Sequence, residues 1–378
     1  MAAVIFFAAA AFILYTLFLY PLLVHLLAAR RPRPTRKEFL PRTVSVLLPV
    51  WNGEQYLARK LDSLLSLDYP QELIDILVIS DGSTDGTAAI ARSYASRGVR
   101  LIEQPRGGKA LCLNAGLAHA TGEILFLTDV RQPIDPGSLR ALVECFADPT
   151  VGAVSGELII RDGQTLEEAS AGLYWKYEKW LRKRLAVIDS VLGATGCIYA
   201  MRRELAAPLP AGCLLDDMYL PLLAFHAGYR VGFEERARAY DEPAAMNSEF
   251  RRKVRTLAGN YQLMGFLPWL LTPSNRLLLH YLSHKVARLV LPFALLALLG
   301  SAWMLPYPWK WICGGGQVLF YGIAVTDRWL PDGSPWKRLT SPAWTFTVLM
   351  AASFWAASIL FRPKADFWGR TQVRGSRP

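Results

Sequence analysis

The first 29 residues, Met1 to Ala29, contain no Asp, Glu, Lys or Arg, and most of them are apolar. About 20 consecutive apolar residues are enough for a helix to cross the hydrocarbon core of a bilayer. A secretory signal peptide carries positive charge before its apolar core, whereas here the basic residues follow it: Arg30, Arg31, Arg33, Arg36 and Lys37. Residues 1–29 are therefore predicted to span the membrane, and the positive-inside rule places the polypeptide after them in the cytoplasm.

The C-terminal third of the chain is also rich in apolar residues. We expect amphipathic helices lying on the membrane surface over 256–285 and C-terminal transmembrane helices over 286–361. Within the second region, Val286 to Leu305 and Pro342 to Leu360 are long enough to span a bilayer. The chain is thus predicted to be an integral membrane protein, which we expect in a bacterial inner membrane.

A third C-terminal segment, Trp311 to Thr326, is shorter and contains three consecutive glycines. Three C-terminal spans would place the basic tail, residues 362–378, outside the cell, against the positive-inside rule. Two spans and one surface or re-entrant segment would keep that tail inside. The sequence leaves the number of spans open.

The overall composition limits the classes of partner that the chain can be expected to bind. The chain has 378 residues, 52% hydrophobic and 19% charged, with a formal net charge of +11. This composition excludes a disordered chain. Much of the basic excess lies beside the apolar segments, which favours anionic lipid headgroups as partners over nucleic acid. The five cysteines show no CxxC spacing, so neither a disulfide framework nor a zinc site is predicted.

Between the apolar ends, a basic, Pro-rich linker over 30–42 leads into a predicted soluble domain over 43–255. Short apolar runs alternate with amphipathic segments in its first half; the runs are Val44 to Val50, Ile74 to Ile79, Val99 to Glu103 and Ile124 to Leu127. Alternating strands and helices predict an α/β fold with a mainly parallel sheet covered on both faces. Functional residues in such sheets gather beyond the carboxyl ends of the strands.

Polar residues follow these predicted strands and open one later helix. They occur at Asn52 to Glu54, Ser80 to Thr87 and Asp129 to Arg131, and as the pair Asp216 and Asp217. Asp, Gly, Ser and Thr also serve as ordinary turn residues and helix N-caps, so each group has a purely structural interpretation. Their order and spacing along the chain favour a shared site.

These motifs resemble family 2 inverting glycosyltransferases of the GT-A fold, in particular the membrane-bound branch that includes cellulose, chitin and hyaluronan synthases. The match covers about 43–255 and implies a Rossmann-like, nucleotide-diphospho-sugar transferase domain with N- and C-terminal transmembrane helices. The residues that the resemblance places near the nucleotide-sugar donor are Pro49, Asn52, Glu54, Asp81, Lys109 and Asn114.

The family usually binds Mg²⁺ or Mn²⁺ with an Asp-x-Asp motif, but here the sequence is Asp129-Val130-Arg131. The resemblance implies Asp129 as a metal ligand, with phosphate oxygens completing the shell of a hard divalent cation. Arg131 either places a positive charge against the diphosphate or forms an outward-facing salt bridge. We therefore expect metal dependence, with Asp129 as the only acid of this motif that binds the metal.

The pair Asp216 and Asp217 resembles the family motif whose second acid is the catalytic base. An acceptor hydroxyl must lose its proton as it attacks the anomeric carbon, so a carboxylate is needed opposite the leaving group. We expect Asp217 to be that base and Asp216 to bind the sugar or orient its neighbour. Two basic residues, Arg252 and Arg255, loosely match the Gln-x-x-Arg-Trp motif of processive synthases, without its Trp. They either contact the diphosphate or face lipid headgroups.

The sequence therefore predicts a hexosyltransferase-type enzyme that transfers a sugar from a nucleotide donor, expected to be UDP-linked, with inversion. Its acceptor is predicted to be a growing polysaccharide or a lipid-linked glycan at the cytoplasmic face, in exopolysaccharide or cell-envelope synthesis. The alternative is a non-catalytic, membrane-bound binding module, suggested by Arg131 in place of the second acid. A channel or transporter would need ionisable residues within the spans, and the predicted spans contain almost none.

Overall fold

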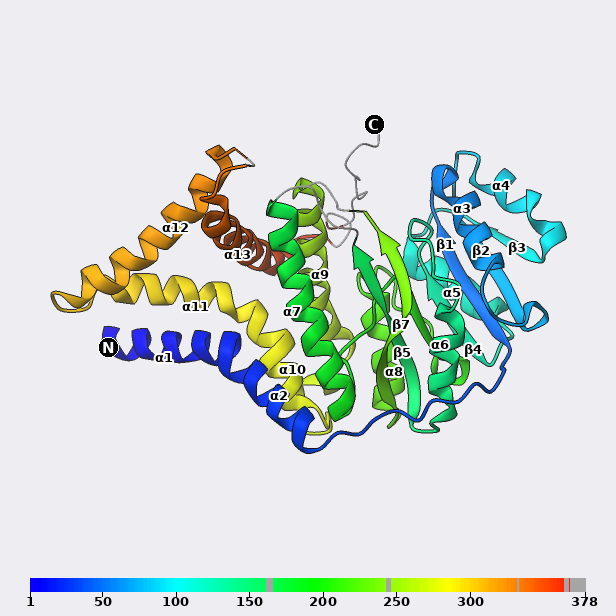
Figure 1. Cartoon of the computed structure of the whole chain (residues 1–378), viewed down its shortest axis with the longest axis horizontal. Coiled ribbons are helices and arrows are strands. Elements are labelled where there is room, and N and C mark those ends of the chain that lie inside the picture. Colours follow the sequence, from blue (N-terminus) through cyan, green and yellow to red (C-terminus); the bar gives the residue numbers. More distant parts are fainter. Residues whose placement is uncertain (161–165, 243–245, 332, 364–366, 368–378) are drawn as a thin grey trace. The chain divides into compact units, whose positions relative to one another are not determined.

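The computed structural model describes residues 1–160, 166–242, 246–331, 333–363 and 367, with side chains left aside at 166–175 and 246–249. The chain folds into two compact units (Figure 1). One unit, the α/β unit, comprises Ala28–Arg161 and Arg182–Glu242. The other, the helical unit, comprises Met1–Leu27, Asp162–Leu181 and Pro243–Pro378.

The described residues of the α/β unit form a seven-stranded sheet in the order β3-β2-β1-β4-β6-β5-β7. The strands are β1 Val44–Val50, β2 Ile74–Asp81, β3 Val99–Gln104, β4 Ile124–Thr128, β5 Val151–Ile160, β6 Ile198–Arg202 and β7 Arg230–Asp241. Strand β6 runs antiparallel to both of its neighbours, and the other pairs are parallel. The predicted α/β sheet is thus confirmed, with one reversed strand.

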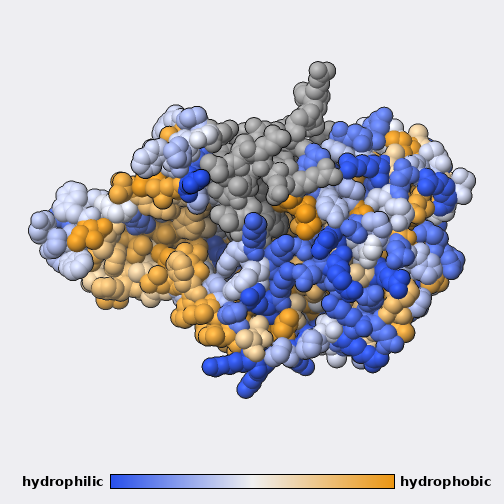
Figure 2. Space-filling view, viewed as in Figure 1, coloured by the Kyte–Doolittle hydropathy of each residue, from blue (hydrophilic) through white to orange (hydrophobic). Residues whose placement is uncertain are grey.

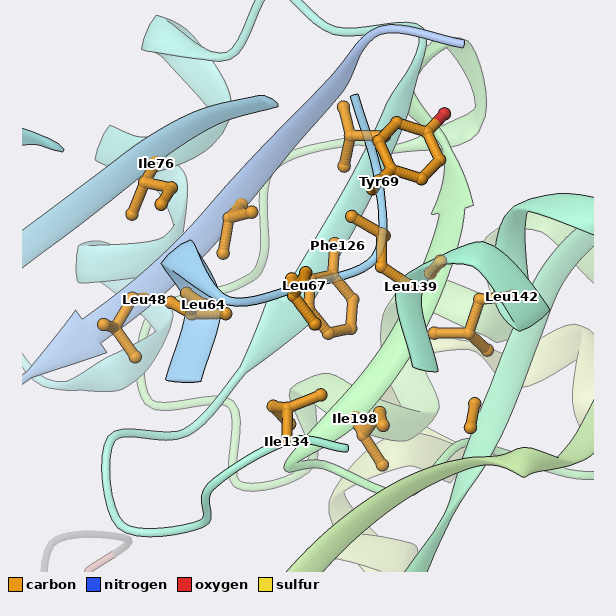
Figure 3. Packing of buried hydrophobic residues seen from close by; sticks show 14 of the residues in the cluster. Leu48, Leu64, Leu67, Tyr69, Ile76, Phe126, Ile134, Leu139, Leu142 and Ile198 are labelled. Carbon is orange, nitrogen blue, oxygen red and sulfur yellow. The ribbon is translucent and has the colours of Figure 1, made fainter. Parts of the chain in front are cut away.

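Helices of the α/β unit pack on the sheet through apolar faces. They are α3 Glu54–Leu65, α4 Thr87–Ser93, α5 Lys109–His119, α6 Ser138–Glu144, α8 Asp216–His226 and the end of α7 Leu166–Ile188. In α3 the buried leucines Leu57, Leu61 and Leu64 are three and four residues apart and so share one face. Figure 3 shows Leu64 beside Leu48 of β1, in one buried cluster that also includes Phe126 of β4 and Ile198 of β6. Each buried side chain of this size contributes about 1.5–3 kcal/mol relative to exposure.

The strand order positions the site. From β1 the chain moves outward to β2 and β3, and then returns through α5 to place β4 on the other side of β1. The connections after β1 and before β4 therefore lead to opposite sides. In open α/β sheets, ligands bind in the crevice outside the carboxyl ends of strands at such a point. The polar segments after β1, β2 and β4 all reach this edge of the sheet.

Among the residues that the structure describes, three helices are long and apolar enough to cross a membrane: Ala2–Arg30, Leu278–Ala302 and Lys337–Leu360. The described helices of the helical unit are α1 Ala2–Leu14, α2 Tyr20–Arg30, α9 Met246–Phe266, α10 Leu278–Tyr281, α11 Ala287–Ala302, α12 Gly316–Thr326 and α13 Lys337–Ala356. Figure 2 shows apolar side chains gathered on the surface over α1 and α11. The predicted N-terminal span and two predicted C-terminal spans thus coincide with helices of sufficient length.

The span around α11 begins earlier than predicted, because the helix continues without a break from Leu278 through a π-helical turn. It therefore includes ionisable side chains that a start at Val286 leaves outside or at the very end. Within the helical unit, Arg288 lies 2.6 Å from Glu178 of α7, and His284 Nε2 lies 3.3 Å from the same carboxylate. Arg288 and Glu178 thus form an ion pair inside the helical unit.

Candidate active site

The segment after β1 is tied to the segment after β2 by side chains of the first predicted motif. Asn52 adopts a left-handed conformation with φ of 47°, and its Oδ1 accepts a hydrogen bond of 2.8 Å from the Thr84 backbone N–H. Glu54 Oε2 accepts one of 3.0 Å from the Gly86 backbone N–H. Pro49 lies within β1 itself and pairs in register with Ile79. Asn52 and Glu54 thus hold two loops together at the edge of the crevice.

Asp81 ends β2 with a side chain only 3% exposed, and it anchors the loop before α5. Its carboxylate accepts hydrogen bonds from the backbone N–H groups of Gly107 at 2.7 Å and Gly108 at 3.0 Å, and from the Arg106 guanidinium. The Arg106 guanidinium in turn lies over the ring of Trp51, 3.9 Å from its centroid. Asp81 therefore fixes a loop that carries an arginine and an aromatic face, neither of which was predicted from the sequence.

A cluster of charges forms where α5, β4 and α8 meet. Lys109 Nζ lies 2.9 Å from Asp129 Oδ1 and 3.2 Å from Asp216 Oδ2. Burial alone would lower the pKa of Lys109, but the carboxylates of Asp129, Asp216 and Asp217 outweigh it and hold the pKa above its ordinary value. Burial raises the pKa of Asp216, and Lys109 opposes that rise. The predicted donor-side lysine, metal ligand and acidic pair are therefore brought together, with Lys109 as a fixed cation.

Asp217 lies against a glycine turn that precedes β6. The Ala194 backbone N–H donates a hydrogen bond of 2.6 Å to the Asp217 carbonyl oxygen. A Cβ added to Gly196 would lie 2.9 Å from Asp217 Oδ2, so the carboxylate occupies space that only a glycine leaves. This glycine turn is thus in direct contact with the predicted base.

Tyr199 of β6 is a site residue that sequence reasoning missed. Its side chain is fully buried, and burial together with the charges of Asp216, Asp217 and Asp129 raises its pKa well above the ordinary value. The hydroxyl therefore stays protonated beside the acids, and among the described residues it has no hydrogen-bond partner. The sequence points to Tyr199 only weakly. Side chains alternate between the two faces of a strand, so Tyr199 faces away from Ile198 and Ala200.

The acid expected in the Asp-x-Asp motif is replaced by Arg131, and the structure pairs this arginine within the fold. Arg131 Nη2 lies 2.5 Å from Asp241 Oδ2 at the end of β7, and Gln132 Nε2 donates to the same oxygen at 2.8 Å. The Arg131 side chain is 18% exposed and that of Asp241 is 6% exposed. The salt bridge is therefore largely buried, in contrast to the outward-facing one considered from the sequence.

Lys60 holds the segment that carries Asp129 and Arg131 through hydrogen bonds. It lies on the buried face of α3 and is 1% exposed. Its Nζ donates hydrogen bonds to Thr128 Oγ1 at 2.7 Å and to the Gln132 carbonyl oxygen at 2.6 Å, on either side of Asp129. Burial lowers the pKa of Lys60 to about 7. The sequence carries a signal for it, since Lys60 falls on the same helical face as Leu57, Leu61 and Leu64.

The remaining predicted residues are Asn114, Arg252 and Arg255. Asn114 of α5 exchanges hydrogen bonds with the backbone of Leu209, donating at 2.9 Å and accepting at 2.7 Å, and so tethers the loop before α8. Arg252 and Arg255 lie on α9, in the helical unit. A donor-binding role for these three residues stays a prediction.

The fit of a divalent cation depends on one carboxylate. In the part of the chain that the structure describes, no group of three or more His, Cys, Asp or Glu side chains is arranged to hold a metal ion. Asp129 is 38% exposed at the end of β4, with Lys109 on its Oδ1. This arrangement fits a cation that takes one protein oxygen and fills its shell with phosphate oxygens, and does not fit one held by the protein alone.

Comparisons with known proteins bear on the family and the fold. Residues 45–208 match the family model described as Glycosyl transferase family 2. The chain is 25% identical over 253 residues to a poly-beta-1,6-N-acetyl-D-glucosamine synthase of Staphylococcus epidermidis, covering 64% of this chain and 60% of that protein. It is 23% identical over 362 residues to the beta-monoglucosyldiacylglycerol synthase of Synechocystis sp., covering 87% and 74%. For three curated relatives the match spans only 59%, 40% and 60% of the relative's own length.

Among solved structures, the chain is similar to the mannosyltransferase PcManGT from Pyrobaculum calidifontis, determined in complex with GDP-Man and Mn²⁺. The TM-score is 0.74 at 22% sequence identity, and the match covers 96% of this chain and 99% of that one. At this identity the likeness concerns the fold. It confirms the predicted class, an α/β domain of the GT-A type accompanied by N- and C-terminal apolar helices.

Proposed function

Residues 45–208 belong to glycosyl transferase family 2, and from that premise we propose that this chain is an inverting glycosyltransferase with Asp217 as its catalytic base. The donor is a nucleotide sugar, expected to be UDP-linked. The observation that carries the proposal is the meeting of Lys109, Asp129 and the Asp216–Asp217 pair at one end of the sheet. If these acids were only helix caps and turn residues, Asp129 and Asp216 would not be expected to contact the same lysine.

The reaction needs a base on one side of the sugar and positive charge on the other. Asp217 takes the proton of the acceptor hydroxyl as its oxygen bonds to the anomeric carbon, and the bond from that carbon to the phosphate oxygen breaks. The electron pair leaves with the nucleoside diphosphate. Lys109 supplies a fixed positive charge within the same cluster, where a partly dry setting makes it more effective than in water. Asp216 holds Lys109 in place at 3.2 Å.

A divalent cation is part of the proposal. Mg²⁺ or Mn²⁺ held by Asp129 and the diphosphate would add positive charge at the leaving group. Asn52, Glu54 and Asp81 act on the donor side by shaping the loops that form the crevice. We therefore expect a chelator to lower turnover and added Mn²⁺ or Mg²⁺ to restore it.

The acceptor is proposed to be a growing polysaccharide or a lipid-linked glycan. Support comes from the names of two relatives, one a polysaccharide synthase and the other a glycolipid synthase. The three apolar helices support catalysis at a membrane. The basic cluster after the first span supports a cytoplasmic active site, since basic residues are retained on that side.

A donor screen tests the proposal. Purified membranes containing the protein are given UDP- and GDP-sugars with Mn²⁺, and nucleotide release and the mass added to extracted lipid or polymer are measured. The matched control is Asp217→Asn, which keeps the shape and removes the base. We expect one donor to be consumed and the variant to be slower by about 10²–10⁴-fold. Equal release from both proteins would refute the base. No turnover of any nucleotide sugar would favour the non-catalytic binding module instead.

A further inference from the structure

Arg182 converges on the glycine turn that contacts Asp217. It belongs to the last part of α7, within the α/β unit. Its Nη1 donates to Thr195 Oγ1 at 2.9 Å, and its Nη2 donates to Ser155 Oγ at 2.8 Å and to the Gly193 carbonyl oxygen at 3.1 Å. One planar guanidinium therefore spans the turn and the neighbouring strand β5.

The turn has further fixed contacts with β5. The Thr195 backbone N–H donates to Ser155 Oγ at 2.9 Å, and Thr195 Oγ1 donates to the Gly156 carbonyl oxygen at 2.9 Å. Ser155 is fully buried. Arg182, Ser155 and Thr195 thus form a small closed network in which each side chain orients the others.

On its other side the turn is packed tightly against the start of α8. Gly193 has a φ of +116°, and a Cβ there would lie 2.5 Å from Met218 Cγ. Gly196 leaves room for Asp217 Oδ2, and the Ala194 N–H holds the Asp217 carbonyl oxygen at 2.6 Å. Because the turn is packed closely against α8, any shift of the turn would also move Asp217.

We propose that Arg182 is a positioning residue for the catalytic base: by clamping the Gly193–Gly196 turn onto β5, it fixes the place of the Asp217 carboxylate. The inference rests on the proposed function, because it gives Arg182 a role only if Asp217 takes the acceptor proton. Lysine cannot replace it, since one ammonium on a flexible stem cannot span the three acceptors in this fixed arrangement.

The first test replaces Arg182 by lysine and separates binding from chemistry. We expect Arg182→Lys to lower kcat by about 10–100-fold, the size of effect that a misplaced catalytic group produces. The KM for the donor and the affinity for the free nucleoside diphosphate should stay unchanged. The control is Arg202→Lys, whose guanidinium likewise bonds backbone carbonyls, those of Val151 and Phe146, in the same unit. An equal loss of kcat in both variants would overturn the proposal.

The second test is a double-mutant cycle with Asp217→Asn. If Arg182 acts through the base, Arg182→Lys should cause no further loss in the Asp217→Asn background, because the group it positions is gone. A loss of the same size in both backgrounds would refute the positioning role. Wild-type turnover by Asp217→Asn would instead refute the base itself, so the two failures are distinguishable.

Thr195→Val provides the same cycle should Arg182→Lys fail to fold. It keeps the shape of residue 195 and removes the hydroxyl that accepts from Arg182. We expect a smaller loss of kcat with unchanged donor KM, and no further loss in the Asp217→Asn background. An unchanged kcat in Thr195→Val, with its melting temperature intact, would count against the network.

Discussion

Two lysines lie on opposite sides of the segment that carries Asp129, and they have opposite electrostatic settings. Lys109 contacts two carboxylates, which hold its pKa above the ordinary value. Lys60 donates only to a hydroxyl and a carbonyl oxygen, and burial lowers its pKa to about 7. The same residue type thus supplies a permanent charge on the reactive side and a near-neutral tether on the structural side. The partners of each lysine decide its role. Two changes test this contrast, and two more test the loops around the site.

Replacing Lys109 by methionine should have the largest effect on stability. The change leaves the carboxylate of Asp216 buried without its cation, and breaking such a pair costs about 3–5 kcal/mol. We expect a lower free energy of unfolding in denaturant titrations, together with loss of turnover. The control is Lys183→Met, which breaks an exposed pair with Glu235 and should cost about 0–1 kcal/mol. Equal costs in the two variants would show that the cluster is not a buried charge site.

Lys60 should make stability depend on pH in the opposite sense to a lysine whose pKa is raised by an ion pair. Its pKa is about 7 in the folded protein and is ordinarily 10.5, so the unfolded chain binds more protons between these values. Its contribution to the free energy of unfolding is therefore least favourable below about pH 7 and improves as the pH rises, by up to about 1.4 kcal/mol per pH unit. The Lys60→Met variant should lack this rise in denaturant titrations between pH 7 and 9.5. A slope identical to that of the wild type would refute the neutral tether.

Asp81→Asn tests the clamp between β2 and the loop before α5. One charged oxygen that accepts backbone N–H groups and the Arg106 guanidinium becomes an amide, which is expected to cost about 1–3 kcal/mol. Nucleotide affinity, measured by calorimetry, should fall with it. The comparison is Asp75→Asn, which loses only an exposed pair with Arg100. An unaltered nucleotide affinity in Asp81→Asn would separate the clamp from donor binding.

The smallest effect is expected at Asn52, where hydrogen bonding and backbone conformation contribute separately. Asn52→Ala loses the bond to the Thr84 N–H and also places alanine at a positive φ, which should cost about 1–2 kcal/mol. Asn52→Gly loses the bond alone and relieves the conformational cost. The glycine variant should therefore melt at a higher temperature than the alanine variant. The reverse order would show that the left-handed conformation carries no cost here.

Much of the α/β fold follows from patterns in the sequence. The first four strands lie within two residues of their predicted bounds, because each is a short apolar run followed by turn residues. Strands β5 and β7 were not predicted, since β7 carries Glu234, Arg236 and Arg238 within an otherwise buried strand. Some of the ion pairs of these side chains, such as Lys37 with Glu234 and Arg236 with Glu144, join residues far apart in the chain. The local pattern of apolar and polar residues therefore could not predict these ion pairs.

The candidate site divides in the same way. Asp129 and the acidic pair were predicted because they follow a strand or open a helix, and Lys109 was predicted from the family resemblance. The partner of Arg131 was not predictable, since Asp241 lies 110 positions later and meets it only through the pairing of β5 with β7 and β6. Tyr199 and Lys60 were missed because their burial comes from helices packing on the sheet. The motifs in the sequence identified the candidate reactive residues. The residues that hold them in place could be identified only from the structure.

The bridge made by Lys109 also has a consequence for biosynthesis. Its two partners, Asp129 and Asp216, come 20 and 107 positions later in the chain (129 − 109 and 216 − 109). During synthesis the first membrane helix and strands β1 to β4 emerge well before α8. A nascent chain therefore has an unfinished charge cluster until α8 has left the ribosome and docked. Under the proposed function, a chain that stops before α8 lacks Asp217 and so cannot consume the nucleotide sugar.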